Sequence, residues 1–185
     1  MGWAKTTRLF NYGENKMRQL IQQIEQWAED RNLIKGSTPQ KQLFKFAEEL
    51  GELFAGHNKK DKELIKDSIG DCFVALTILS AQFGYHCLDD DILEAYECYQ
   101  FPPEKYAGTT NLNFLLSWTG NLASALEYEE IAEPFELIGL LAYNLMHYAY
   151  GAGFDFYDCV KHAYDQIKDR KGKMIDGVFV KEEDL

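Results

Sequence analysis

Proline is scarce in this chain of 185 residues and occurs only at positions 39, 102, 103 and 134. Between these positions apolar residues recur every three or four residues, which is the period of a helix and not of a strand. The composition, with 46% hydrophobic and 26% charged residues, excludes collagen-like and low-complexity chains. The sequence therefore predicts an all-α fold, a bundle of about seven helices in a single domain over residues 1–185.

Cysteine is also infrequent, and its positions are far apart. Cys72, Cys87, Cys98 and Cys159 form no Cys-x-x-Cys pair, and no apolar N-terminal segment precedes them. This pattern favours neither a disulfide framework nor secretion. We expect a reducing, cytoplasmic environment.

Positive charge is the third shortage. Lys and Arg number 19 against 30 Asp and Glu, which gives a net charge of -11 at pH 7. Such a field repels nucleic acids and anionic membranes, so neither is expected as a partner. Residues 135–154 are apolar, but Glu136, Asn144 and His147 and the lack of basic flanks favour a buried helix over a membrane span. Any polyanionic ligand then requires a local basic cluster or a metal ion.

Apolar periodicity and capping residues locate the helices. We expect them over residues 15–31, 39–55, 62–83, from 89 onward, and over 112–126, 134–150 and 155–169. Ser37 and Thr38 supply a cap before Pro39, and Gly84 suits a left-handed C-cap. Residues 173–185 lose the helical period, which predicts an extended tail.

A shift of 68 residues superposes the end of the third helix and the fourth helix on the last two. It places Asp90 on Asp158 and Ala95-Tyr96 on Ala163-Tyr164. An internal duplication, with residues 15–100 as an acidic half and 112–172 as a degenerate half with a basic end, explains this order. The alternative is a chance similarity of helical patterns.

The chemical signal is strongest in two pairs of acidic residues. Glu49 and Glu52 are three residues apart and Asp67 and Asp71 are four apart, so each pair shares a helix face. Antiparallel helices would bring these four carboxylates together, and the cluster would repel itself unless a cation were present. Oxygen ligands select a hard ion, which predicts Mg²⁺, with Mn²⁺ as an alternative. The competing interpretation is that these acids are solvated surface residues.

Two glycines and the positions of the histidines also help to interpret the acidic cluster. Gly51 and Gly70 each stand beside an acid, and we expect them to let the helices approach closely. No histidine has a glutamate three residues before it, which disfavours a di-iron bundle.

The acidic pattern resembles that of the all-α nucleoside triphosphate pyrophosphohydrolases of the MazG type. The similarity rests on the EExxE of residues 48–52, the acid-x-x-x-Asp of residues 67–71, and the closing segment 163–182, AYDQIKDRKGKMIDGVFVKE. It covers about residues 15–98 and 150–182. The resemblance implies a homo-oligomer that hydrolyses a nucleotide between its α and β phosphates, giving a monophosphate and pyrophosphate with magnesium.

The resemblance also implies roles for individual acids. Glu49, Glu52 and Asp71 correspond to metal ligands, and Glu48 to a further ligand or to the base that orients the attacking water. The second half of the family motif is usually ExxD, but Ser68 stands at the position of its Glu. Asp67, one residue earlier, is the expected substitute.

Local positive charge completes the predicted site. We expect phosphates to be bound by Lys45, one turn before Glu49, and by the cluster Lys168, Arg170, Lys171 and Lys173. The final helix, from the same chain or from a partner subunit, should therefore end beside the acidic cluster. Cations that favour a helix C-terminus are the alternative for any one of these residues. A catalytically silent helical protein, a nucleotide sensor or a dimerisation module, is the alternative function.

Overall fold

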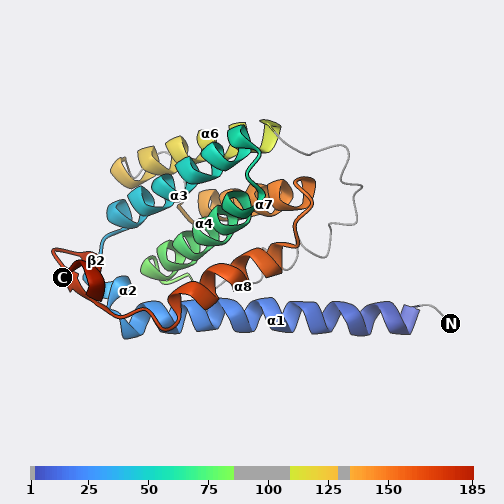
Figure 1. The fold of residues 1–185 in the computed structure, drawn as a ribbon, viewed down its shortest axis with the longest axis horizontal. Helices are drawn as coiled ribbons and strands as arrows, with labels where there is room; N and C mark the ends of the chain where they lie inside the picture. The colour runs from blue at the N-terminus through green and yellow to red at the C-terminus, as the bar shows by residue number, and fades with distance from the viewer. Residues whose placement is uncertain (1–2, 86–108, 129–133) are drawn as a thin grey trace.

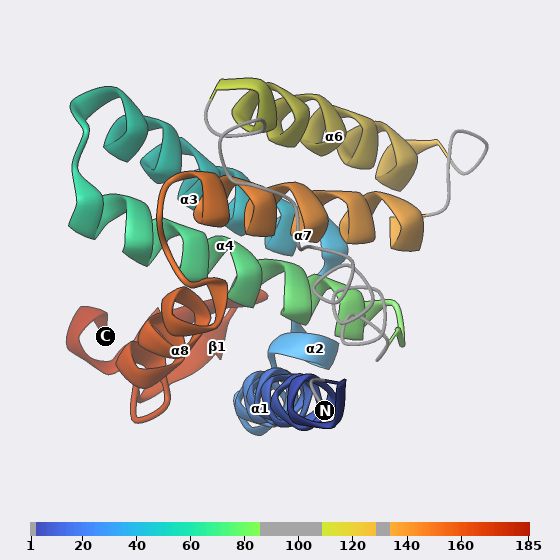
Figure 2. The ribbon, with the colours of Figure 1, turned by 90° about the vertical axis from the view of Figure 1, so that its right-hand side faces the viewer.

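The computed structural model describes residues 3–85, 109–128 and 134–185, with side chains described from residue 16. Within these ranges the chain forms seven α-helices and one two-stranded hairpin, which confirms the all-α bundle (Figure 1). The helix expected from residue 89 lies outside the described residues. Helices α3, α4, α6 and α7 group together, and α8 and α1 lie on the other side of α4 (Figure 2).

Helices α3 (Pro39–Lys59) and α4 (Lys62–Gln82) form the antiparallel pair that carries the predicted acids. Thr38 accepts a hydrogen bond from the Lys41 backbone N–H at the start of α3, as the sequence predicts. The helix does not end near Ala55 but continues to Lys59. Gly56 lies in this additional turn and is buried against α4, where an added Cβ would lie 3.1 Å from Ile65.

Helices α6 (Thr109–Glu127) and α7 (Pro134–Gly151) form a second pair, which packs on α3 and α4. Leu141, Ala142 and Leu145 of α7 are fully buried, so the apolar segment 135–154 is mostly a core helix, as expected. Among the described helices, none combines the length and apolar character that a membrane crossing requires.

Helix α8 (Phe156–Ile167) lies against α4 at Gly70. A Cβ at Gly70 would collide with the carbonyl of Cys159 and would lie 2.7 Å from the Ala163 methyl group. Gly70 thus allows a close approach, but it is the approach of α8 to α4 and not the predicted one between the acid-bearing helices α3 and α4. The same expectation for Gly51 is wrong, because Gly51 is exposed and an added Cβ there would meet nothing within 4 Å.

Helix α1 (Trp3–Asp30) begins well before the predicted residue 15, and the short helix α2 (Leu33–Gly36) follows it. The end of α1 secures the end of α8. The Trp27 indole N–H donates to the Ile167 carbonyl, and the Arg31 guanidinium donates to the Lys168 and Arg170 carbonyls. These donors satisfy carbonyl groups that the helix C-terminus leaves without intrahelical partners.

The C-terminal segment is a hairpin and not the extended tail that was expected. Strands β1 (Gly172–Ile175) and β2 (Val178–Lys181) are antiparallel, and the 3-10 helix η2 (Glu182–Asp184) follows. Asp176 (φ 50°) and Gly177 (φ 77°) form the turn. Positive φ at both central residues is the type I′ geometry that Asp-Gly favours. Ser37 and Lys41 donate to backbone carbonyls of this turn and hold it against the start of α3.

The helix bounds agree with the predicted 68-residue shift. Residues 39–59 of α3 become 107–127, against 109–127 for α6, and residues 62–82 of α4 become 130–150, against 134–151 for α7. Gly84 and Gly153, near the ends of the second helix of each pair, both have positive φ. The duplication of residues 15–100 and 112–172 stays a hypothesis, because part of the first unit lies outside the described residues.

Candidate functional site

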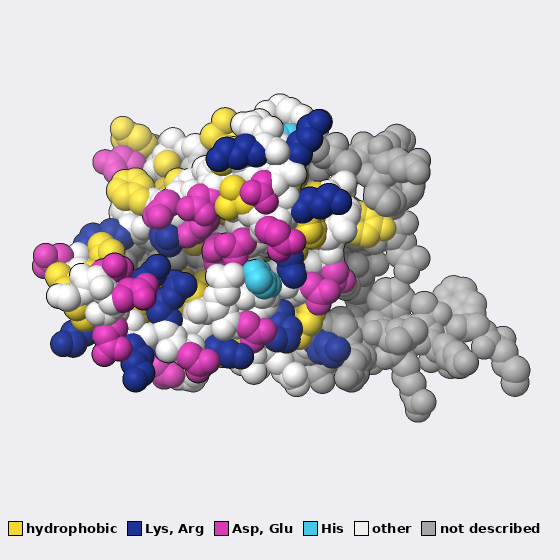
Figure 3. Space-filling view, viewed as in Figure 1, with side chains coloured by type: hydrophobic (Ala, Val, Ile, Leu, Met, Phe, Trp, Pro, Cys, Tyr) yellow, Lys and Arg dark blue, Asp and Glu magenta, His cyan; other side chains and the backbone are white. Residues whose placement is uncertain are grey.

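A cavity of about 460 Å³ lies between α3, α4, the end of α8 and the hairpin. All five predicted acids line it: Glu48, Glu49, Glu52, Asp67 and Asp71. Figure 3 shows acidic side chains gathered across the middle of this face, with Lys and Arg side chains grouped beside them toward the hairpin end. The acids therefore do not form a uniformly solvated helix face.

The acids of α3 surround a lysine of the same helix. Lys45 Nζ lies 2.5 Å from Glu49 Oε1 and 3.3 Å from Glu48 Oε1. Glu49 is 7% exposed, and burial raises the pKa of its carboxyl group against the opposing effect of Lys45. Burial would lower the pKa of Lys45, but hydrogen bonding and the charge of Glu49 raise it. Lys45 thus partly neutralises the α3 acids.

Asp71 of α4 is the most perturbed carboxyl group of the cavity. Its pKa is raised to about 7, first by burial and then by the charges of Glu49 and Asp67. The lysine and arginine nearby, Lys45 and Arg170, oppose this rise without cancelling it. Repulsion from these two carboxylates therefore adds to burial in favouring the protonated form of Asp71.

The acids line one cavity but are not assembled into a preformed coordination set. Among the described residues, no group of three His, Cys, Asp or Glu side chains is arranged to hold a metal ion. Side-chain rotations would be needed to bring the carboxylates of α3 and α4 onto one ion.

Four cations border the cavity: Lys41, Lys45, Arg170 and Lys181. Lys45 and Arg170 were predicted from the sequence, whereas Lys41 and Lys181 were not. Lys181 belongs to β2, whereas Lys41 belongs to α3 and donates to the Asp176 carbonyl of the hairpin turn. The Asp-Gly pair at residues 176–177, flanked by apolar residues, was the sequence signal that could have predicted this hairpin.

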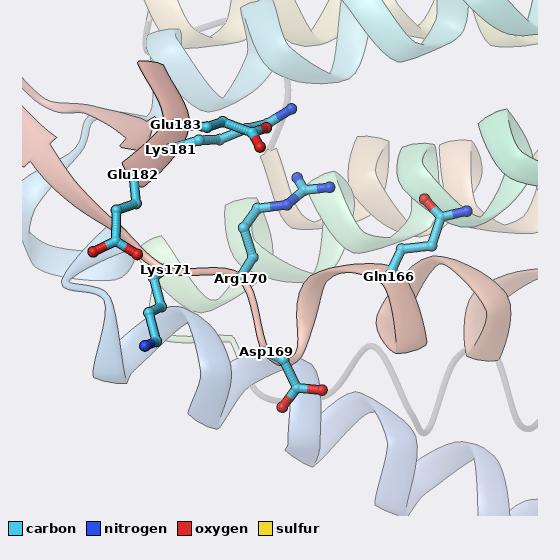
Figure 4. Close-up of a pocket in the computed structure, with 7 residues that line it drawn as sticks. All are labelled: Gln166, Asp169, Arg170, Lys171, Lys181, Glu182 and Glu183. Carbon is cyan, nitrogen blue, oxygen red and sulfur yellow. The ribbon is translucent and has the colours of Figure 1, made fainter. Parts of the chain in front are cut away.

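The expected placement of Lys168 and Lys171 beside the acids is wrong in this chain. Lys168 Nζ lies 2.8 Å from Asp165 Oδ1, and this bond raises the pKa of Lys168. The two lysines line other cavities, and Figure 4 shows Lys171 pointing away from Arg170. Helix α8 ends at Ile167, and the turn that follows it places Arg170, but neither Lys168 nor Lys171, on the acidic cavity.

An adjoining cavity of about 570 Å³ shares Gln166, Arg170 and Lys181 with the acidic one (Figure 4). Its remaining lining residues are Asp169, Lys171, Glu182 and Glu183. The three shared side chains form the border between the two cavities.

The other end of the acidic cavity is apolar. Trp27 and Phe179 pack edge to face with ring centroids 6.1 Å apart, and Val74, Ala75 and Ile78 of α4 lie on the same cavity. Trp27 was not among the site residues predicted from the sequence. Carboxylates, cations and an apolar wall in one space suit a ligand that has both phosphate groups and an apolar part.

Comparison with known proteins finds a phage relative. Over 66 residues the chain is 61% identical to a protein of Haemophilus phage HP1 (strain HP1c1), an uncharacterized 18.2 kDa protein in the rep-hol intergenic region. The alignment covers 36% of this chain and 40% of the relative. No family model and no solved structure matches the chain. The MazG-type resemblance therefore rests on the residues alone and stays a prediction.

Proposed function

We propose that this protein is a magnesium-dependent nucleoside triphosphate pyrophosphohydrolase. The observation that carries the proposal is a single cavity in which five carboxylates from two helices face cations from three elements beside an apolar wall. A polyphosphate needs cations or a metal in so acidic a protein, and the apolar wall suits a nucleoside.

The donor set fits Mg²⁺. All five acids supply the hard oxygen ligands that magnesium prefers, and none of the described residues that line the cavity is Cys or His. The raised pKa of Asp71, caused by burial and by the charges of Glu49 and Asp67, reflects negative charge that a divalent ion would offset. Glu49, Glu52, Asp67 and Asp71 are the proposed ligands, with Mn²⁺ as an alternative ion.

The proposed reaction is attack of water on the α-phosphorus. A bond forms between the water oxygen and phosphorus, the α–β bridging bond breaks, and the products are a nucleoside monophosphate and pyrophosphate. Bound magnesium would supply charge neutralisation for the phosphates. Glu48, whose side chain is 63% exposed beside Lys45, orients the water and accepts its proton.

The cations and the apolar wall hold the substrate on either side of the reacting phosphate. Arg170 and Lys181 donate to phosphate oxygens, and Lys45, which pairs with Glu48 and Glu49, would donate to a phosphate once magnesium neutralised these carboxylates. Trp27 and Phe179 contact the nucleoside. The protein thereby positions the α-phosphate beside the carboxylates.

The proposal is tested with the purified full chain, a panel of nucleoside triphosphates and Mg²⁺. We expect equal amounts of monophosphate and pyrophosphate, and no release in the presence of a chelator. Release of orthophosphate alone would contradict the cleavage site. Binding of nucleotide without turnover would favour the nucleotide sensor.

A further inference from the structure

The second acidic motif of this chain has Asp67 where an acid at position 68 is expected. The shift by one residue changes the neighbour that the carboxylate faces. Successive residues of an α-helix are rotated by about 100°, so Asp67 and Ser68 point in different directions from α4. Asp67 lines the acidic cavity, whereas Ser68 is 1% exposed and does not line it. Gly70, three residues after Asp67 and on the same side of the helix, marks the line of contact with α8. Asp67 is therefore directed toward α8.

A side chain of α8 meets Asp67 at this position. Gln166 Nε2 donates to Asp67 Oδ1 over 2.8 Å. His162, one turn earlier on α8, has its Nε2 atom 3.5 Å from the same oxygen and 2.9 Å from Gln166 Nε2. One oxygen of the carboxylate is thus held from α8 across 99 residues of sequence.

The backbone contact between α4 and α8 fixes the register of this pair. Without a Cβ on Gly70, the helix backbones approach at Cys159 and Ala163, and Gln166 follows Ala163 by three residues. Trp27 and Arg31 hold the far end of α8 through its last carbonyl groups. Helix α8 is thus fixed both at its contact with Gly70 and at its C-terminal end. This holds Gln166 in position beside Asp67.

We propose that Gln166 is a positioning residue that orients the Asp67 carboxylate toward the divalent-cation site of the cavity. The inference rests on the proposed function, which requires that site. Partner groups that hydrogen-bond a metal ligand orient it and affect metal affinity. A solvent-accessible hydrogen bond contributes little to folding, so the effect should fall on the metal and not on stability.

The test measures Mn²⁺ binding to the full chain by calorimetry in a double-mutant cycle. Gln166→Met keeps the side-chain length but removes the amide donor, and it should weaken Mn²⁺ binding about tenfold. Asp67→Asn should weaken binding at least as much. The double variant should bind no more weakly than Asp67→Asn alone, because Gln166 acts through Asp67. Lys161→Ala, an exposed change on α8 outside the acidic cavity, is the matched control and should change neither affinity nor melting temperature.

Unchanged Mn²⁺ affinity of Gln166→Met, or losses that multiply in the double variant, would overturn the proposal. If the wild-type chain binds Mn²⁺ and hydrolyses nucleotides while the cycle is additive, only the role of Gln166 fails. If the wild-type chain binds no Mn²⁺, the proposed function fails and this inference with it.

Discussion

The α3–α4 pair and the α6–α7 pair have nearly the same bounds after a shift of 68 residues, but they present different chemistry. Glu49, Glu52 and Asp71 of the first pair correspond by this shift to Ser117, Gly120 and Gly139 in the second. Both pairs keep a buried apolar seam, with Phe46 and Leu53 in one and Leu115 and Leu141 in the other. Packing of a helical pair therefore depends on the seam, and the residues beside the seam are free to differ.

A second difference is what covers each pair. Helix α8, the end of α1 and the hairpin enclose the acidic side of α3 and α4. On α6 and α7, Leu116 is 60% exposed and Leu140 is 37% exposed within the part of the chain that the structure describes. The candidate site therefore depends on both the acids and the elements that enclose them.

The largest expected effect comes from removing one acid of the first pair. Glu52→Gln should lower turnover by about 1,000-fold or more, because a proposed metal ligand is lost while the fold is retained. Pyrophosphate release under saturating Mg²⁺ measures the effect. Ser117→Ala, at the position that corresponds to Glu49 in the second pair, should leave turnover unchanged. Normal activity of Glu52→Gln would remove this glutamate from the site.

The pH dependence of stability should separate Asp71 from ordinary acids. The pKa of Asp71 is about 7 in the folded chain against an ordinary value of 3.8, so the folded chain keeps a proton that the unfolded chain loses. The stability of the metal-free protein should therefore fall as pH rises from about 4 to 7. Asp71→Asn should reduce this fall to the part that Glu49 contributes and raise the free energy of unfolding by about 2 to 4 kcal/mol at pH 8. Urea unfolding at a series of pH values measures this difference. Parallel plots of the free energy of unfolding against pH for the wild-type chain and the variant would contradict the prediction.

Substitutions at the neighbouring positions 67 and 68 of α4 should differ in their effect on the magnesium dependence of turnover. Asp67→Asn should raise the Mg²⁺ concentration needed for half-maximal turnover at least about tenfold. Ser68→Ala should have little effect, since Ser68 is buried and outside the cavity. Magnesium titrations of initial rate decide the order, and the reverse order would show that Ser68 is the functional position.

Substitutions of cations inside and outside the cavity should have different effects on the Michaelis constant for nucleotide. Arg170→Ala should raise the Michaelis constant for nucleotide about tenfold, because a charge-assisted contact with phosphate is lost. Lys168→Ala should change it little, since Lys168 is paired with Asp165 on another face. Steady-state kinetics at two salt concentrations test this prediction, which an equal effect of the two substitutions would refute.

The smallest effect concerns the two glycines. Gly51→Ala should stabilise α3 by about 1 kcal/mol, because the position is exposed and unobstructed. Gly70→Ala should destabilise the chain, because the added Cβ would push α8 from α4. Thermal melts of both variants provide the measurement. A destabilised Gly51→Ala variant would show that Gly51 has a packing role after all.

Several features followed from local sequence alone. Helical periodicity and the cap at Thr38 placed most described helices close to their observed bounds, because capping and periodicity act over a few residues. The acids also reached one cavity as expected, since a short turn between α3 and α4 forces the two helices to lie antiparallel. The charge of the chain also predicts that any polyanionic ligand needs local cations or a metal ion, and this stays a prediction.

Tertiary contacts decided what local sequence could not. The outward direction of Lys168 and the inward direction of Arg170 depend on where α8 docks, and that docking depends on Gly70, Trp27 and Arg31, which are distant in sequence. The hairpin reaches the cavity because Ser37 and Lys41 hold its turn beside α3. The bond from Gln166 to Asp67 joins residues 99 positions apart. Periodicity specifies which residues share a face, but only the packing of one element on another specifies what that face meets.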